Sequence, residues 1–288
     1  MGAYYFHQTS GCTDELAYNY GEQEECKYQK YGDYALEFND GSDYVNIGRP
    51  LSSYSDDNIT ISSWLNTTED NYPNNEGVGH FISNDTQASN PQINLWMRNS
   101  GQVHLHGEGF ECMSNKSIND GIWHNVVAIK DGGTLSLYID NEYQCSASGQ
   151  SDLDNGEDWF LGAHRPGGDD HAYRGLMSNV KFINRNINLS DISILYNGGN
   201  VEDTVADYRF DDITPNELVD YVGNNNGVFY GEPTWVEHVY GCIDQFACNY
   251  NEEANSNDGS CDYSCHDNGD YSLSFDSSSS LPQGDGLN

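Results

Sequence analysis

The chain has 288 residues, and its 46 acidic against 11 basic residues give a net charge of −35. This charge excludes nucleic-acid binding, because neutralising phosphates requires clustered lysine and arginine side chains. No segment approaches the roughly 18 consecutive apolar residues of a transmembrane helix. Calcium-binding acidic loops and a salt-adapted acidic surface both fit such a composition.

A short cysteine-containing stretch occurs twice. Gly11-Cys12 returns as Gly241-Cys242, and each copy is followed by a Gly-Asp-Tyr sequence, at 32–34 and 269–271. A repeat of this length indicates a tandem array. We therefore expect the tail of a preceding unit at 1–10, a small cysteine module at 11–30, a large domain at 31–200, a strand-and-turn extension at 201–240, a second cysteine module at 241–265 and the start of the next unit at 266–288.

The eight cysteines are even in number, and their spacing does not suit paired zinc ligands, which are the alternative to disulfides. Cys248 and Cys265 in the second copy are both missing from the first, where Tyr18 and Lys30 stand. Two cysteines that are absent together are most simply partners. The predicted disulfides are Cys12–Cys26, Cys242–Cys261, Cys248–Cys265 and, by remainder, Cys112–Cys145. Such staples favour a secreted or cell-surface protein.

Between residues 34 and 183, short alternating apolar runs are separated by Gly, Asn, Asp and Ser. Alternation of apolar and polar residues with a period of two predicts an all-β sandwich. The expected strands are 36–38, 44–47, 59–65, 93–97, 103–105, 123–129, 135–139, 159–161 and 180–183. One helix is expected over 189–196, capped near Asn188 or Ser190 and stopped by Gly198-Gly199.

Five segments resemble, in order, the signature strands of laminin-G-like, concanavalin A-like jelly rolls. They are residues 34–45, 59–65, 121–128 with its Trp-His pair, 135–141 and 175–185. With the extension and the cysteine modules, the order is similar to large secreted surface proteins of marine bacteria. The resemblance implies adhesion, glycan binding or architectural spacing.

The turn at 39–43 supplies several oxygen ligands of the kind that calcium prefers. The resemblance implies a structural calcium near the opening and closing strands, where this chain has Ser178 followed by Asn179 in place of a frequent aspartate. Asp40, Asp43 and Asn179 are therefore the candidate calcium ligands. The alternative is an ordinary Asp-Gly turn held by local hydrogen bonds.

Glycan recognition needs an aromatic platform with polar groups in loops. Trp64 and Trp123 fit core positions, so Trp96 and the Gly-rich loop with Asp169, Asp170 and His171 are the candidate binding residues. His104 and His106 share a strand face, which we interpret as solvated rather than metal-binding. No strand carries the paired carboxylates of a glycosidase, so we expect no enzyme. Possible glycosylation sites are Asn58, Asn66, Asn84, Asn115 and Asn188.

Together these features predict a repeat unit of an extracellular surface fibre or adhesin, stabilised by calcium. Its partners would be neighbouring copies or adjacent repeats and glycans. The alternative is a carbohydrate-binding, lectin-like module of a secreted protein.

Overall fold

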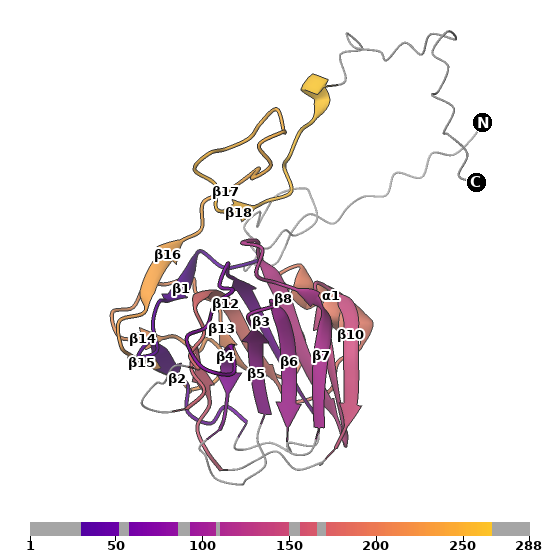
Figure 1. Ribbon diagram of the computed structural model, residues 1–288, viewed down its shortest axis with the longest axis vertical. Coiled ribbons are helices and arrows are strands. Elements are labelled where there is room, and N and C mark those ends of the chain that lie inside the picture. The colour runs from indigo at the N-terminus through magenta and orange to yellow at the C-terminus, as the bar shows by residue number, and fades with distance from the viewer. Residues whose placement is uncertain are drawn as a thin grey trace, which may run out of the picture. The chain divides into compact units, whose positions relative to one another are not determined.

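The computed structural model describes residues 30–51, 58–85, 93–107, 110–149, 156–165 and 171–266. The chain divides into two units, Met1–His238 and Val239–Asn288. The first unit is a sandwich of two antiparallel sheets (Figure 1), which confirms the all-β jelly roll that the alternating pattern predicts. The tail at 1–10 and the first cysteine module up to residue 29, with Cys12 and Cys26, lie outside the described residues, as do residues 267–288.

The first sheet has the strand order β10-β9-β8-β3-β12-β1-β16, and β13 also pairs with β12. Every pairing in it is antiparallel. Its strands are β1 (Tyr34–Phe38), β3 (Asn58–Asn66), β8 (His124–Asp131), β9 (Thr134–Ile139), β10 (Glu142–Ser148), β12 (Gly175–Ile183), β13 (Thr204–Tyr208) and β16 (Thr234–Glu237).

The second sheet has the order β14-β15-β2-β11-β4-β5-β6-β7. Its strands are β2 (Tyr44–Asn46), β4 (Val78–Ser83), β5 (Ile93–Arg98), β6 (Gln102–Gly107), β7 (Phe110–Ser117), β11 (Phe160–Leu161), β14 (Glu217–Leu218) and β15 (Gly227–Tyr230). The inward side chains of both sheets, among them Leu36, Leu95 and Leu137, form one continuous buried core.

The predicted helix is present as α1 (Leu189–Tyr196). Asn188 caps it, because the Asn188 side chain accepts hydrogen bonds from the backbone of Ser190 and Asp191. Ile192 and Leu195 pack against Val127, Ile129 and Ile183. These three strand residues point away from the main core, so α1 covers the outer face of the first sheet.

Residues 201–240, expected as an extension, supply strands to both sheets of the sandwich. β13 pairs with β12, β16 pairs with β1, and β15 pairs with β2. The backbone N–H of His238 donates to the carbonyl of Asp33 at 2.9 Å, so the chain leaves the sandwich beside the point where β1 begins. The segment up to His238 is thus part of the sandwich.

A buried ion pair links β12 to β13. The Lys181 ammonium contacts the Asp207 carboxylate, and their side chains are 4% and 1% exposed. Arg209 donates from Nε to the same carboxylate at 2.7 Å. Burial lowers the pKa of Lys181, against the attraction of Asp207. Because a buried charge is tolerated only with a partner, the pair ties β13 to the sheet.

Asp140, in the turn between β9 and β10, is the centre of a second polar network. Its carboxylate binds Lys116 Nζ and His124 Nδ1, each at 2.6 Å, and accepts from the Asn125 backbone N–H at 2.9 Å. His124 is buried, and its Nε2 lies 3.0 Å from Asp120. Trp123 is buried too, so both members of the Trp-His pair lie inside the sandwich.

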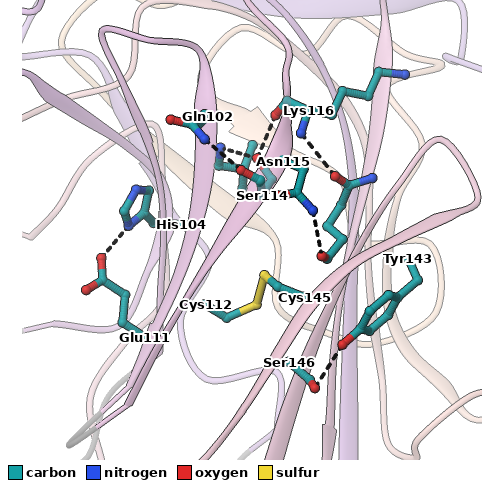
Figure 2. Close-up of a disulfide and its surroundings, with 12 residues drawn as sticks. Gln102, His104, Glu111, Cys112, Ser114, Asn115, Lys116, Tyr143, Cys145 and Ser146 are labelled. Atoms are coloured by element: carbon teal, nitrogen blue, oxygen red, sulfur yellow. Dashed lines mark hydrogen bonds and ion pairs between the residues drawn. A yellow bond between two sulfur atoms is a disulfide. The ribbon is translucent and has the colours of Figure 1, made fainter.

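The disulfide between Cys112 and Cys145 joins β7, the last strand of the second sheet, to β10, the last strand of the first (Figure 2). The Cα atoms of the two cysteines are 5.8 Å apart. Beside them, the Lys116 backbone N–H donates to the Gln144 side chain. The predicted pairing is present, and it closes this side of the sandwich.

Removing the disulfide between Cys112 and Cys145 is expected to destabilise the sandwich. Replacing both Cys112 and Cys145 by alanine should lower the free energy of unfolding by about 2–4 kcal/mol, because the disulfide restricts the unfolded chain over a separation of 33 residues. Urea denaturation of the oxidised wild type and the double variant measures the difference. If the urea denaturation curves of the two proteins have equal midpoints and slopes, the disulfide does not contribute to stability.

The second unit is a small disulfide-bonded module. Two short strands, β17 (Tyr240–Gly241) and β18 (Ser256–Asn257), pair in parallel. The disulfides Cys242–Cys261 and Cys248–Cys265 are those that comparison of the two sequence copies predicts. A 3₁₀ turn, η1 (Ser264–His266), ends the described part of the chain.

Candidate functional site

Aromatic and imidazole rings gather on the outer face of the second sheet. In β5, Leu95 and Met97 point into the core, so Trp96 between them points outward. The same alternation in β6 places His104 and His106 on the outer face beside Val103 and Leu105, which are in the core. β5, β6 and β7 lie side by side (Figure 1), and cross-strand pairing sets Trp96 opposite both His80 and His104.

Trp96 is the centre of this surface. Its ring stacks on His80, with centroids 5.3 Å apart and an interplanar angle of 26°. The His104 ring meets it edge-on, with centroids 4.9 Å apart, and the Arg98 guanidinium carbon lies 5.4 Å from the centroid of the indole ring. Trp96 remains partly exposed. An indole held by its neighbours in this way is a rigid apolar platform with charged and polar groups at its border.

The border of the platform is fixed by hydrogen bonds through His104. Its Nδ1 bonds to the Glu111 carboxylate (Figure 2), and its Nε2 accepts from Arg98 Nε at 3.0 Å. Burial lowers the pKa of His104, which opposes the raising effect of Glu111. We assign a neutral ring with its hydrogen on Nδ1, because Nε2 is an acceptor. His104 thereby orients one cationic and one anionic side chain beside Trp96.

Three further imidazoles form what we call the histidine cluster: His80, His164 and His171. His80 is in β4, and the other two lie between β11 and β12. The ring centroids of His80 and His164 are 4.1 Å apart, those of His164 and His171 5.7 Å, and those of His80 and His171 6.3 Å. The His80 backbone N–H donates to the His171 carbonyl at 2.7 Å, which holds the two residues together.

The structure thus joins two of the residues that the sequence predicts for ligand binding. Trp96 and His171 both pack against His80, which sequence reasoning did not single out. Asp169 and Asp170 lie outside the described residues. His80 and His164 are far apart in the sequence and follow no motif spacing, so only the strand pairing of β4 with β5 and β11 reveals them.

A polar cavity of about 390 Å³ lies where β1 ends and β12 begins. Arg174 lies in it, with NH1 3.7 Å from the Glu69 carboxylate. The other polar lining residues are Glu37, Asn39, Asn66, Thr67 and Thr68. The cavity borders the acidic turn at 39–43, and it offers hydrogen-bonding groups with no exposed aromatic ring, since its Phe38 is buried.

The three residues predicted to bind calcium do not form one site. Asp43 is buried and accepts from the backbone N–H groups of Asn39 and Glu232 at 3.0 and 2.8 Å. Asp40 accepts from Ser42, and that hydrogen bond lowers the pKa of Asp40. Asn179 donates to the Lys30 carbonyl, at the opposite end of β1. The structure therefore does not bring Asn179 together with Asp40 and Asp43, because antiparallel pairing of β12 with β1 separates them.

The predicted glycosylation sites differ in exposure. Asn58, Asn115 and Asn188 are exposed and Asn66 is partly buried. Asn84 is only 2% exposed, and its amide oxygen accepts from the Ile93 backbone N–H. Asn84 is thus the least accessible of the five predicted glycosylation sites.

The laminin G profile, described as the concanavalin A-like lectin/glucanases superfamily, matches residues 39–193. Since this is more than half of the 288 residues, the chain belongs to that superfamily. The sequence matches no curated protein. None of the helices in the described residues is long and apolar enough to cross a membrane.

The chain is similar to several solved structures. A Bacteroides ovatus protein provisionally described as carbohydrate binding is 17% identical, with a TM-score of 0.57 over 74% of this chain and 62% of that protein. The match therefore spans less than two thirds of its length. A pentraxin from Limulus polyphemus is 13% identical (TM-score 0.45, 71% of this chain and 91% of that one). The LG4-5 domains of mouse laminin α1 are 14% identical (TM-score 0.43, 56% and 44%).

Proposed function

We propose that this chain is a secreted, lectin-like adhesive module that binds a carbohydrate on the outer face of its second sheet, at Trp96. The observation that carries the proposal is the partly exposed indole, held rigid between His80, His104 and Arg98. The C–H groups of a sugar ring can lie against such a platform, and its hydroxyls then meet the polar border.

The border has both kinds of hydrogen-bonding partner that a sugar hydroxyl needs. Arg98 donates only, whereas the Glu111 carboxylate, 47% exposed, accepts only. Both are oriented by His104, so little side-chain entropy is lost when a ligand binds. The surface is therefore suited to a neutral saccharide. A strongly anionic one is disfavoured by the charge of −35.

Membership in a superfamily that includes lectins supports this proposal, as does the shared fold of the Bacteroides ovatus protein. The disulfides support secretion, because such bonds persist in oxidising compartments. The finer proposal is that the chain is a repeat unit of a surface fibre or adhesin. It is supported by the duplicated cysteine stretch in the sequence.

Substituting the platform is expected to remove glycan binding. Trp96→Ala should weaken binding of a glycan selected on an array by at least about 10-fold, or about 1.4 kcal/mol. Isothermal titration of the full chain measures the change. Tyr143→Ala is the matched control, because Tyr143 is a 57% exposed aromatic residue on β10 of the other sheet. If the wild type binds no glycan, or both variants weaken binding equally, the proposed site is wrong.

Calcium stabilisation is a further proposal, supported by the acidic composition and by the turn at Asp40. Adding calcium to metal-free protein should raise the melting temperature, because an ion that binds only the folded state stabilises it by about 2.7 kcal/mol at 100 times its dissociation constant. Magnesium at equal ionic strength is the control for screening. If calcium and magnesium raise the melting temperature equally, the proposal of specific calcium binding is wrong.

A further inference from the structure

We propose that the ligand bound at Trp96 is a linear, neutral oligosaccharide of about five sugar units, whose other end lies on a second aromatic platform at Tyr230. The inference rests on the proposed function, because it extends the same ligand across the same face of the second sheet. A sugar unit in an extended chain has nearly the length of one strand spacing, which is about 4.8 Å. The number of strands between two platforms therefore sets the length of the chain that reaches both.

Tyr230, in β15, is an exposed aromatic ring held by its neighbours, as Trp96 is. The Tyr230 ring stacks on Tyr44 of β2, with centroids 4.6 Å apart and an interplanar angle of 2°. Tyr44 in turn packs edge-on against Phe160, with centroids 6.0 Å apart. Tyr44 and Phe160 are buried, whereas Tyr230 is 44% exposed. One face of the Tyr230 ring is thus fixed by Tyr44, and its exposed part can lie against the C–H groups of a sugar ring.

Both platforms lie on the outer face of the second sheet. In β2, Val45 is in the core, so Tyr44 beside it points outward. Tyr230 lies directly opposite Tyr44 across the pairing of β15 with β2, so it is on the same face. The strand order from Tyr230 to Trp96 is β15-β2-β11-β4-β5, which makes four spacings of about 4.8 Å, or about 19 Å. A chain of about five units, one for each strand, covers this distance.

The two platforms also lie at nearly the same level along the strands. β2 and β4 both run antiparallel to β11, so they are parallel to each other. Phe160 of β11 is opposite both Asn46 and Ser83. Tyr44 comes two residues before Asn46, and His80 comes three residues before Ser83, toward the same end of the sheet. The partners of Tyr44 and His80, which are the two platforms, therefore line up in a row across the strands.

Packed side chains connect the two platforms. Ala163, just after β11, is buried in one cluster with Tyr44. The next residue, His164, stacks on His80, and His80 stacks on Trp96. The His164 side chain is 17% exposed, so a polar ring lies between the two aromatic ends. Because these side chains already hold one another, little side-chain entropy is lost when a ligand lies along the row.

The second platform has polar groups beside it. Asn46 lies on the outer face of β2, next to Tyr44, and its Nδ2 donates to Asp158 Oδ2 at 3.0 Å. An amide and a carboxylate together offer donors and acceptors to sugar hydroxyls. The net charge of −35 disfavours a chain of acidic or sulfated sugars, so the class of ligand that these groups suit is a neutral chain.

The test is the dependence of affinity on chain length. Calorimetric titration of the full chain uses a series from disaccharide to hexasaccharide of the neutral glycan selected on the array. We expect the affinity to rise by at least about 10-fold between trisaccharide and pentasaccharide, because only the longer chain reaches both platforms. Tyr230→Ala should abolish this rise and leave the affinity for the disaccharide unchanged. Tyr230→Phe should keep the rise, because the ring alone can stack on a sugar.

The matched control is Tyr250→Ala, because Tyr250 is a 46% exposed tyrosine of the second unit. This variant should show the same dependence on chain length as the wild type. Melting curves check that each variant is folded. Sedimentation at the titration concentrations checks that the wild type and Tyr230→Ala have the same oligomeric state.

Three results would overturn the extended site: an affinity that does not rise with chain length, a rise that persists in Tyr230→Ala, or a dimer of the wild type that Tyr230→Ala dissociates. The last result would make Tyr230 a contact between copies. In each of these cases, disaccharide binding that is lost in Trp96→Ala still supports the proposed function. If the wild type binds no member of the series, the proposed function and the extended site are both wrong.

Discussion

Replacing Asp207 with alanine is expected to lower the free energy of unfolding by about 3–5 kcal/mol, the usual cost of removing one member of a buried ion pair. The variant leaves the ammonium of Lys181, 4% exposed, without the carboxylate that compensates its burial. Arg209 is less affected, because its side chain is 22% exposed and can turn toward solvent. Urea denaturation at neutral pH measures the difference.

The matched control removes both charges. The double variant Lys181→Met with Asp207→Leu should lose much less stability than Asp207→Ala, because apolar side chains can replace a buried pair at little cost. If the single and double variants are equally unstable, the effect arises from packing of β13 and the ion-pair explanation is wrong.

Asp140→Asn is expected to cost about 3 kcal/mol at pH 6, because it removes the charge that holds Lys116 and buried His124. The cost should depend on pH. Burial alone would lower the pKa of His124, but the hydrogen bonds to Asp140 and Asp120 raise it above 6.5. The contribution of the charged pair is thus fully present below pH 6.5 and is lost as pH rises through the higher pKa of the folded state.

Stability curves of wild type and Asp140→Asn over the range from pH 5 to 9 test this expectation. The gap between them should narrow above pH 6.5 and level off at the remaining contribution of Lys116. When Asp140→Asn is made in a chain that already carries His124→Gln, its cost in stability should no longer depend on pH. A gap that widens with rising pH would contradict the assigned roles of His124 and Asp140.

Much of the sandwich could be predicted from alternation. The strands at 59–65 and 135–139 match β3 and β9 closely, because apolar and polar residues alternate along most of each segment. β7 and β10 carry mostly polar residues, and they adjoin each other through the disulfide of Cys112 and Cys145. Since a cysteine in a polar strand gives little hydrophobic signal, neither strand was expected.

β4 was missed for a different reason. All six of its residues are buried, and apolar and polar residues do not alternate along its sequence, Val-Gly-His-Phe-Ile-Ser. Gly79 and His80 interrupt its apolar run. A Cβ atom added to Gly79 would lie 2.2 Å from the Tyr72 ring, so only glycine fits there. The His80 ring stacks on Trp96 and His164. Contacts with distant segments therefore dictate these two residues, and local sequence cannot show them.

The candidate site was predictable in its aromatic part and not in its imidazole part. Trp96 stands out because tryptophans are few and its strand neighbours are apolar. The histidine cluster depends on β11 pairing with β4, which brings together segments that are distant in the chain. The sequence of the acidic turn could not show that Asp43 accepts hydrogen bonds from the backbone, including that of remote Glu232.

The adjacency of β1 and β16 has a mechanical consequence. The chain enters the sandwich near Asp33 and leaves it at His238, and these residues are joined by a backbone hydrogen bond. Tension applied to the flanking segments would act on one corner and pull an antiparallel strand pair apart one hydrogen bond at a time. Because β1 also pairs with β12, the load would pass through β1 into the first sheet, whereas β5, which carries Trp96, lies in the second sheet.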